Sequence, residues 1–230
     1  MPRLACVCSV VVVLWAVGSA QADGGGSQPL VRLEESVVVR ARPAPSAPAI
    51  QVVSMRRPIT GSRTVLPVLQ QATGPAGVRW LRVALPARPN GRTGWIRAAE
   101  GTPAQTDWQI VVHRGAHRAV VLENGRARRT FSVVVGKPST PTPLGRFFVT
   151  EKLWLGDGVS EGPWALATSA YSDVLQHFAG GPGEIGLHGD VGFSAPLGSS
   201  ASHGCIRFAD AAISWIAAHV GPGTPILVER

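Results

Sequence analysis

Residues 185–207 read IGLHGDVGFSAPLGSSASHGCIR, and the rest of the chain is organised around this stretch. It contains Cys205, the one cysteine outside the N-terminal apolar segment, together with His188 and His203. A thiol with imidazoles near it in the sequence has the composition of an activated nucleophile and its base. A buried structural cysteine is the alternative interpretation of the same residue.

Acyl transfer by a thiol needs a thiolate, a base, an acceptor that orients the base, and donors for the oxyanion. Gly204 permits a tight turn, so the amides of residues 203–205 could converge on an oxyanion. Arg207 adds positive charge, which favours a thiolate or binds a substrate carboxylate. Chemistry alone allows either histidine to be the base, and Asp190 could orient either imidazole.

A zinc site is a competing interpretation, because His188, His203 and Cys205 are all zinc-ligand types. No paired-ligand spacing accompanies them, so we expect neither a metal nor another cofactor. The four other histidines are expected at surface or core positions.

Residues 1–22 have the pattern of an export signal. Arg3 precedes the apolar run 4–17, which is too short to span a bilayer comfortably, and Ala20-Gln21-Ala22 is a small-x-small cleavage site. An uncleaved membrane anchor is the alternative. Cleavage leaves Cys205 without a partner for an internal disulfide, and a free thiol in an oxidising compartment must be buried or used. We therefore expect an exported protein of the cell envelope, in the periplasm or the wall.

Residues 23–105 are expected to form a separate basic β module. Short β-type runs occur at 36–40, 80–84 and 94–97, and the Pro-Asn-Gly turn at 89–91 leads into the last of them. This ending resembles that of a small bacterial SH3-like barrel. Residues 101–106 have the composition of a linker.

The charge is unevenly distributed. Residues 23–105 hold eleven arginines against four acids, whereas residues 106–230 hold ten basic and ten acidic residues. A solvated basic surface is the default interpretation; the sharper hypothesis is that the module binds an anionic envelope polymer or lipid head groups. There is no nucleic-acid motif, so no nucleic-acid partner is expected.

Residues 106–230 are expected to be rich in β-strands, with one short C-terminal helix. Asn124-Gly125 predicts a hairpin, and Asp210–His219 has apolar residues on one helical face. Hairpin order predicts an antiparallel sheet. The expected strands are 109–112, 119–122, 129–135, 147–151 and 225–228.

The spacing from His188-Gly189 to Ser202-His-Gly-Cys-Ile-Arg207 resembles the signature of the L,D-transpeptidases of bacterial cell walls, the YkuD-type domain. The blocks at 134–136, 140–145 and 223–226 also resemble that family. The resemblance covers roughly residues 108–228. It implies a β-rich catalytic domain over 106–230, and hence a mainly β protein.

The resemblance also implies site roles. Cys205 would be the nucleophile, His188 its base, and the main-chain carbonyl of Gly189 the acceptor that orients the imidazole. His203 would shape the site, and Asp190 would not be required.

The loop before the nucleophile would supply the rest of the site. Ser202 and Gly204 would shape it, and the amides of 203–205 would form the oxyanion hole. Many family members have Asn at the position of Arg207, so any Asn-specific role is in doubt here.

The implied activity is that of an exported cysteine L,D-transpeptidase. Its partners would be peptidoglycan stem peptides, one as donor and one as acceptor, and its product a cross-link between their third residues made through a Cys205 thioester. One alternative uses water as acceptor, giving an L,D-carboxypeptidase or a hydrolase of wall-linked proteins. The other is a non-catalytic envelope-binding protein.

Overall fold

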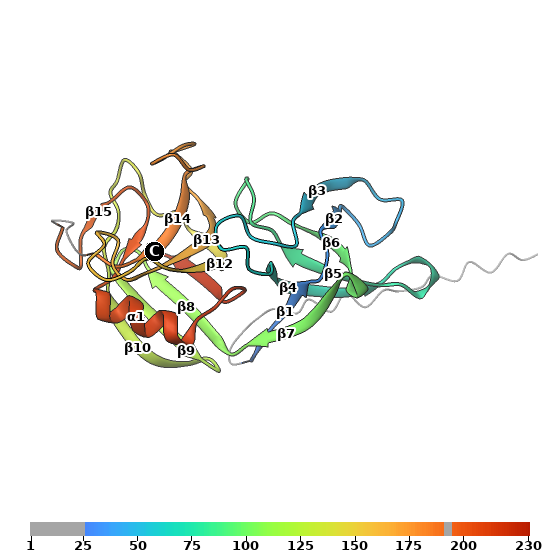
Figure 1. The fold of residues 1–230 in the computed structure, drawn as a ribbon, viewed down its shortest axis with the longest axis horizontal. Helices are drawn as coiled ribbons and strands as arrows, with labels where there is room; N and C mark the ends of the chain where they lie inside the picture. Colours follow the sequence, from blue (N-terminus) through green and yellow to red (C-terminus); the bar gives the residue numbers. More distant parts are fainter. Residues whose placement is uncertain (1–25, 191–194) are drawn as a thin grey trace, which may run out of the picture.

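A computed structural model describes residues 26–190 and 195–230. The expected signal, residues 1–22, lies outside the described residues. The chain forms two β-rich lobes side by side, an N-terminal lobe (28–106) and a C-terminal lobe (107–229), as Figure 1 shows. The predicted mainly β class is confirmed. Within residues 26–190 and 195–230, no helix has the length and apolar character needed to cross a membrane.

The N-terminal lobe is built on a seven-stranded sheet with the order β3-β2-β6-β5-β4-β1-β7. Its interior is lined by alternate residues of the strands, such as Leu33, Leu66 and Ile96, all fully buried. The strands are β1 (Gln28–Leu33), β2 (Val37–Arg40), β3 (Ala49–Val53), β4 (Val65–Thr73), β5 (Arg79–Ala84), β6 (Thr93–Arg97) and β7 (Gly101–Thr106).

Three of these strands agree with the runs predicted at 36–40, 80–84 and 94–97, but the linker prediction is wrong. Gly101–Thr106 is the edge strand β7, paired with β1 along its whole length. A Cβ at Gly101 would lie 2.5 Å from Cγ2 of Val31, so the missing side chain lets the strands approach. The SH3-like identity of this lobe stays a prediction.

The C-terminal lobe contains an eight-stranded sheet with the order β10-β9-β8-β17-β12-β13-β14-β16, and α1 (Asp210–His219) lies against it. The predicted helix is confirmed, with Ile213, Ile216 and Ala217 buried. The strands are β8 (Trp108–His113), β9 (Arg118–Glu123), β10 (Arg126–Ser132), β12 (Gly145–Trp154), β13 (Trp164–Tyr171), β14 (Glu184–His188), β16 (Ile206–Arg207) and β17 (Pro225–Glu229).

The prediction of an antiparallel sheet is wrong for two pairs, because β17 runs parallel to β8 and β14 runs parallel to β16. The run predicted at 129–135 is also divided. Its start belongs to β10, and its end forms β11 (Val135–Gly136), which pairs in parallel with β15 (Ser200–Ser202) outside the main sheet. Parallel pairs join segments far apart in the sequence, which a hairpin pattern does not report.

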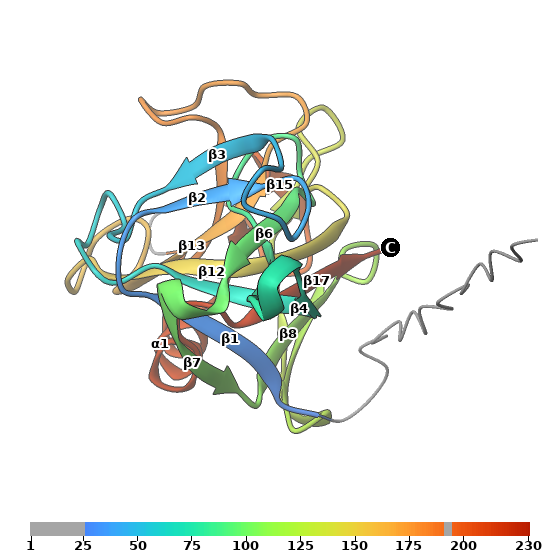
Figure 2. The same ribbon diagram turned by 90° about the vertical axis from the view of Figure 1, so that its right-hand side faces the viewer.

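Strand β12 belongs to both lobes. Successive side chains of a strand point to opposite faces. Phe147 accordingly packs in the core of the C-terminal lobe, while Phe148, 2% exposed, packs in the core of the N-terminal lobe. A Cβ at Gly223 would lie 2.8 Å from side-chain atoms of Leu30 and Val65. Figure 2 views the molecule from the side of the N-terminal lobe, whose strands lie in front of the C-terminal sheet in this view.

A buried charge also joins the lobes. Glu151 of β12 is fully buried, and its carboxylate lies 3.5 Å from Nε of Arg57 in the N-terminal lobe. The same carboxylate accepts hydrogen bonds from the N–H and the hydroxyl of Thr60, at 2.7 and 2.8 Å. A buried carboxylate needs such partners. Arg57 therefore stabilises the contact between the two lobes.

Candidate active site

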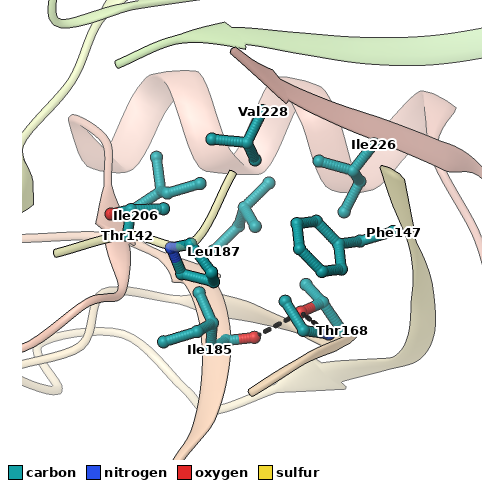
Figure 3. Close-up of a pocket in the computed structure, with 10 residues that line it drawn as sticks. Thr142, Phe147, Thr168, Ile185, Leu187, Ile206, Ile226 and Val228 are labelled. Atoms are coloured by element: carbon teal, nitrogen blue, oxygen red, sulfur yellow. Dashed lines mark hydrogen bonds between the residues drawn. The ribbon is translucent and has the colours of Figure 1, made fainter. Parts of the chain in front are cut away.

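The parallel pair β14–β16 brings the candidate residues together. Leu187 pairs with Ile206, and both point into the apolar pocket of Figure 3, where Thr168 donates a hydrogen bond to the carbonyl of Ile185. His188 pairs with Arg207 in the same register. Because side chains alternate along a strand, His188 and Arg207 face away from this pocket.

Cys205 precedes β16 and lies beside the start of the same strand pair. The N–H of Gly186 donates to its Sγ at 3.4 Å. Gly186 is two residues before His188, about 7 Å along the strand and on the same face. The structure therefore brings the thiol and the upstream imidazole to one face of neighbouring strands, although 16 residues separate them in the sequence.

The surroundings of Cys205 favour the thiol over the thiolate. Burial raises the pKa of Cys205 above its ordinary value of 9.0, against the lowering effects of the Gly186 N–H and the Arg207 charge. The nearby carboxyl of Glu184 raises it further. Such a thiol needs a base to become a nucleophile.

The backbone orients the imidazole of His188. Its Nδ1 lies 2.6 Å from the carbonyl oxygen of Gly189. A carbonyl oxygen only accepts, so Nδ1 carries the proton in this contact. Burial is the main cause that lowers the pKa of His188, which favours the neutral ring; the Gly189 carbonyl opposes this shift.

Gly189 is required for steric reasons. A Cβ there would lie 2.3 Å from Oδ1 of Asp210 and 2.6 Å from Cα of Gly162. The same Oδ1 accepts a hydrogen bond from the N–H of Asp190 at 3.2 Å. The start of α1 thus fixes the backbone that presents the Gly189 carbonyl to the imidazole.

His203 is held differently. Its Nε2 lies 3.3 Å from Nζ of Lys137, and its ring stacks on Phe178 with centroids 4.9 Å apart. An ammonium group only donates, so the Nε2 lone pair of His203 is directed at Lys137. This arrangement suits a structural role and favours His188 as the base.

The turn before Cys205 is closed by Ser202, which is fully buried. Its hydroxyl donates to the carbonyl of Cys205 at 2.6 Å and accepts from the N–H of Gly204 at 3.1 Å. Gly204 has φ +124°, and a Cβ there would lie 2.6 Å from Cδ1 of Ile185, so no other residue fits this turn without strain. Because the Gly204 amide is directed at Ser202, the expected oxyanion donors reduce to the amides of residues 203 and 205.

Two threonines that the sequence analysis did not single out support this turn. The hydroxyl of Thr142 donates to the carbonyl of Gly204 at 2.7 Å and accepts from the N–H of Gly136 at 2.9 Å. Thr140 donates to the carbonyl of Ser202 at 3.3 Å. The available signal was the Thr-Pro-Thr-Pro block itself, which carries two hydroxyls on a stiff backbone.

Arg207 and Asp190 form a pair. Their charged groups approach to 3.7 Å, and their side chains are only 12% and 10% exposed. Burial raises the pKa of Asp190, against the lowering effect of Arg207, and Asp210 raises it further. Asp190 is thus the partner of Arg207, while the imidazole of His188 is oriented by Gly189. Among residues 26–190 and 195–230, no group of three or more His, Cys, Asp or Glu side chains is arranged to hold a metal ion.

Comparison with known proteins places the chain in a family. The L,D-transpeptidase catalytic domain family (YkuD) matches residues 107–228. A putative L,D-transpeptidase YkuD of Bacillus subtilis (strain 168) is 29% identical over 128 residues, which cover 56% of this chain and 70% of that protein. Among solved structures, an L,D-transpeptidase from Mycobacterium tuberculosis H37Rv has a TM-score of 0.49 at 15% identity, covering 87% of this chain and 96% of that one. Another, from Mycobacterium smegmatis, has a TM-score of 0.43 at 19% identity, covering 72% and 99%. The family match extends over more than half of the chain and includes each candidate site residue, so the protein belongs to the L,D-transpeptidase (YkuD) family.

Proposed function

We propose that this protein is an exported transpeptidase that cross-links peptidoglycan stems through a thioester on Cys205. The observation that carries the proposal is the 2.6 Å contact between Nδ1 of His188 and the Gly189 carbonyl, on the strand whose face also holds the thiol. It supports an imidazole that the backbone holds in a fixed orientation, on the face that carries the thiol. Family membership supports the reaction class.

The first half of the proposed reaction is the acylation of Cys205. The pKa of Cys205 is raised and that of His188 is lowered, so the resting pair is neutral. The thiol proton moves to Nε2 of His188 as Sγ attacks the carbonyl of the third residue of a tetrapeptide stem. The amides of residues 203 and 205 are proposed to stabilise the oxyanion. The C–N bond to the terminal D-alanine then breaks, and His188 returns the proton to the leaving amine.

The second half transfers the acyl group to a neighbouring stem. Its side-chain amine attacks the thioester and loses a proton to His188, and the Cys205 thiolate leaves and is protonated again. The product joins the third residues of two stems. Transient imidazolium is favoured by the carbonyls of Gly189 and Glu161, both of which raise the pKa of His188.

Purified muropeptides test this proposal. Tetrapeptide donor and acceptor should give a cross-linked dimer, and mass spectrometry after incubation with a carbapenem should find an adduct on Cys205. Hydrolysed donor without dimer would instead favour the carboxypeptidase alternative. Neither product nor adduct from folded protein would refute both and favour a non-catalytic role.

Paired variants test the assignment of the two histidines. His188→Ala should lose acylation, whereas His203→Ala should retain it, because the lone pair of His203 already faces Lys137. The opposite result in folded variants would exchange the two roles.

We also propose export through residues 1–22, and retention of the N-terminal lobe on an anionic envelope polymer. The eleven arginines of residues 23–105 support the second proposal. Co-sedimentation with cell walls should decrease as salt is raised. Retention that does not respond to salt, or no retention, would contradict it. A shortened mass beginning at Asp23 in the secreted protein would support cleavage after Ala22.

A further inference from the structure

The N-terminal lobe reaches the site through the turn between β5 and β6. Arg88 and Asn90 in this turn contact the segment that joins β13 to β14, residues 172–183, here named the 172–183 loop. The contacts are to the backbone of the loop, apart from one to the carboxylate of Asp173. They therefore fix the course of the loop with little dependence on its side chains.

Arg88 bonds to the beginning, the middle and the end of the loop. Its Nη1 donates to the carbonyl of Ser172 at 2.7 Å, and its Nη2 donates to the carbonyls of Leu175 and Pro182 at 3.0 and 3.1 Å. The guanidinium also lies over the ring of Tyr171, 5.0 Å from its centroid. Hydrogen bonds from a charged donor are about twice as strong as neutral ones. One side chain thus ties three points of the loop together.

Asn90 anchors the strand that enters the loop. Its side-chain nitrogen donates to the carbonyl of Tyr171 at 2.8 Å, and its side-chain oxygen accepts from the N–H of the same residue at 2.9 Å. The amide of Asn90 therefore pairs with the backbone of Tyr171 as a neighbouring strand would. The loop is fixed at its base as well as across its middle.

The tip of the loop reaches the nucleophile turn. Phe178 and Gly181 exchange two backbone hydrogen bonds of 3.0 and 2.9 Å, which close the tip. The Phe178 ring stacks on His203 at an interplanar angle of 28° and remains 45% exposed. His203 is two residues before Cys205, so the Phe178 ring packs against the turn that carries the thiol, and the stacked pair is here named the wall.

We propose that Arg88 and Asn90 are positioning residues for the donor stem, because they hold the wall that Phe178 and His203 form beside Cys205. The inference rests on the proposed function and deepens it. The exposed ring of Phe178 offers an apolar face to the aliphatic side chain of a stem diamino acid. If only a fraction of molecules hold the loop in place, the apparent affinity for the donor is the intrinsic affinity multiplied by that fraction.

The test compares Arg88→Ala and Asn90→Ala with Arg79→Ala in the full chain. Arg79 is exposed on β5, so its replacement removes the same charge as Arg88→Ala without touching the loop. Each positioning variant should raise the donor KM about tenfold while kcat changes less than about threefold, as expected for loss of the competent population. Alkylation of Cys205 by iodoacetamide, which needs no wall, should stay within about twofold.

A second measurement reports on the loop without any reaction. Chymotrypsin cleavage after Phe178, followed by mass spectrometry, should accelerate at least about fivefold in Arg88→Ala and Asn90→Ala, and not in Arg79→Ala. Phe178→Ala should raise KM as well, and combining it with Arg88→Ala should give less than the product of the two effects, because both act through one wall.

The outcomes separate the two levels of the argument. A folded wild-type protein that turns over no donor would refute the proposed function, and with it the donor wall, while the cleavage rates would still decide whether Arg88 and Asn90 hold the loop. With an active wild type, unchanged KM in the positioning variants would overturn the inference. Equal changes in KM, kcat and alkylation would also overturn it, because they would indicate a general structural role.

Discussion

Glu184→Gln should have a larger free energy of unfolding than wild type at pH 8. At pH 4.5 this advantage over wild type should be smaller. Glu184 opens β14, two residues before the Gly186 amide that bonds the thiol. Burial raises its pKa from 4.5 to about 7; Arg57 opposes this shift, and the buried Glu151 carboxylate adds to it. Glutamine keeps the shape of the side chain and stays neutral at every pH.

The sign follows from linkage. The pKa of Glu184 is higher in the folded than in the unfolded protein, so its contribution to stability is fully present below pH 4.5 and is lost as the pH rises through about 7. At 1.36 kcal/mol for each pH unit, raising the pKa from 4.5 to about 7 corresponds to at most about 3 kcal/mol. Because the side chain is only partly buried, about 1–3 kcal/mol is the expected size.

Urea unfolding followed by tryptophan fluorescence measures this effect at pH 4.5 and pH 8. The free-energy difference between Glu184→Gln and wild type should increase by about 1–3 kcal/mol between the two pH values. Titration of groups that do not interact with Glu184 is common to both proteins and cancels. Glu35→Gln, at an exposed position, controls for the removal of one carboxylate. A difference that is the same at both pH values would refute the reasoning.

Three further predictions concern the site. Thr142→Val should cost about 1–3 kcal/mol of stability and lower turnover, because the carbonyl of Gly204 loses its donor; Thr142→Ser should restore both, and a Val variant as active as Ser would contradict this role. Gly189→Ala should lower the melting temperature, because its Cβ would lie 2.3 Å from Oδ1 of Asp210; an unchanged melting temperature would disprove the steric requirement. The rate of Cys205 alkylation in the free protein should rise with pH to a midpoint above 9.0, and a midpoint below that value would show an activated resting thiolate instead.

Local patterns predicted the elements that depend on local physics. The helix at 210–219 follows from its apolar face and from the Gly-Pro-Gly that comes after it, and the Asn124-Gly125 turn joins β9 to β10 as expected. The parallel strand pairs could not be predicted in this way. Strand β17, for example, pairs with β8 across more than a hundred intervening residues. The edge strand β7 was mistaken for a linker for the same reason: its partner is the distant β1.

The candidate site, too, could be predicted from the sequence only in part. Residue types and spacing identified Cys205 and two candidate bases, and the family resemblance chose between the histidines. The structure adds partners that the sequence does not reveal, the Gly189 carbonyl for His188 and the Lys137 ammonium for His203. The role of Thr142 was not anticipated for a related reason: its hydroxyl bonds a residue 62 positions away.

Phe147 and Phe148, adjacent on β12, have a consequence for where the chain can be truncated. The segment that matches the family, 107–228, includes Phe148, whose ring completes the interior of the other lobe. Cutting the chain at residue 106 would uncover that ring, at a cost of about 2–3 kcal/mol, together with the Glu151 carboxylate beside it. The two lobes should therefore be expressed together, as one unit. A relative that carries the catalytic segment alone should have a polar side chain in place of Phe148 and an uncharged one in place of Glu151.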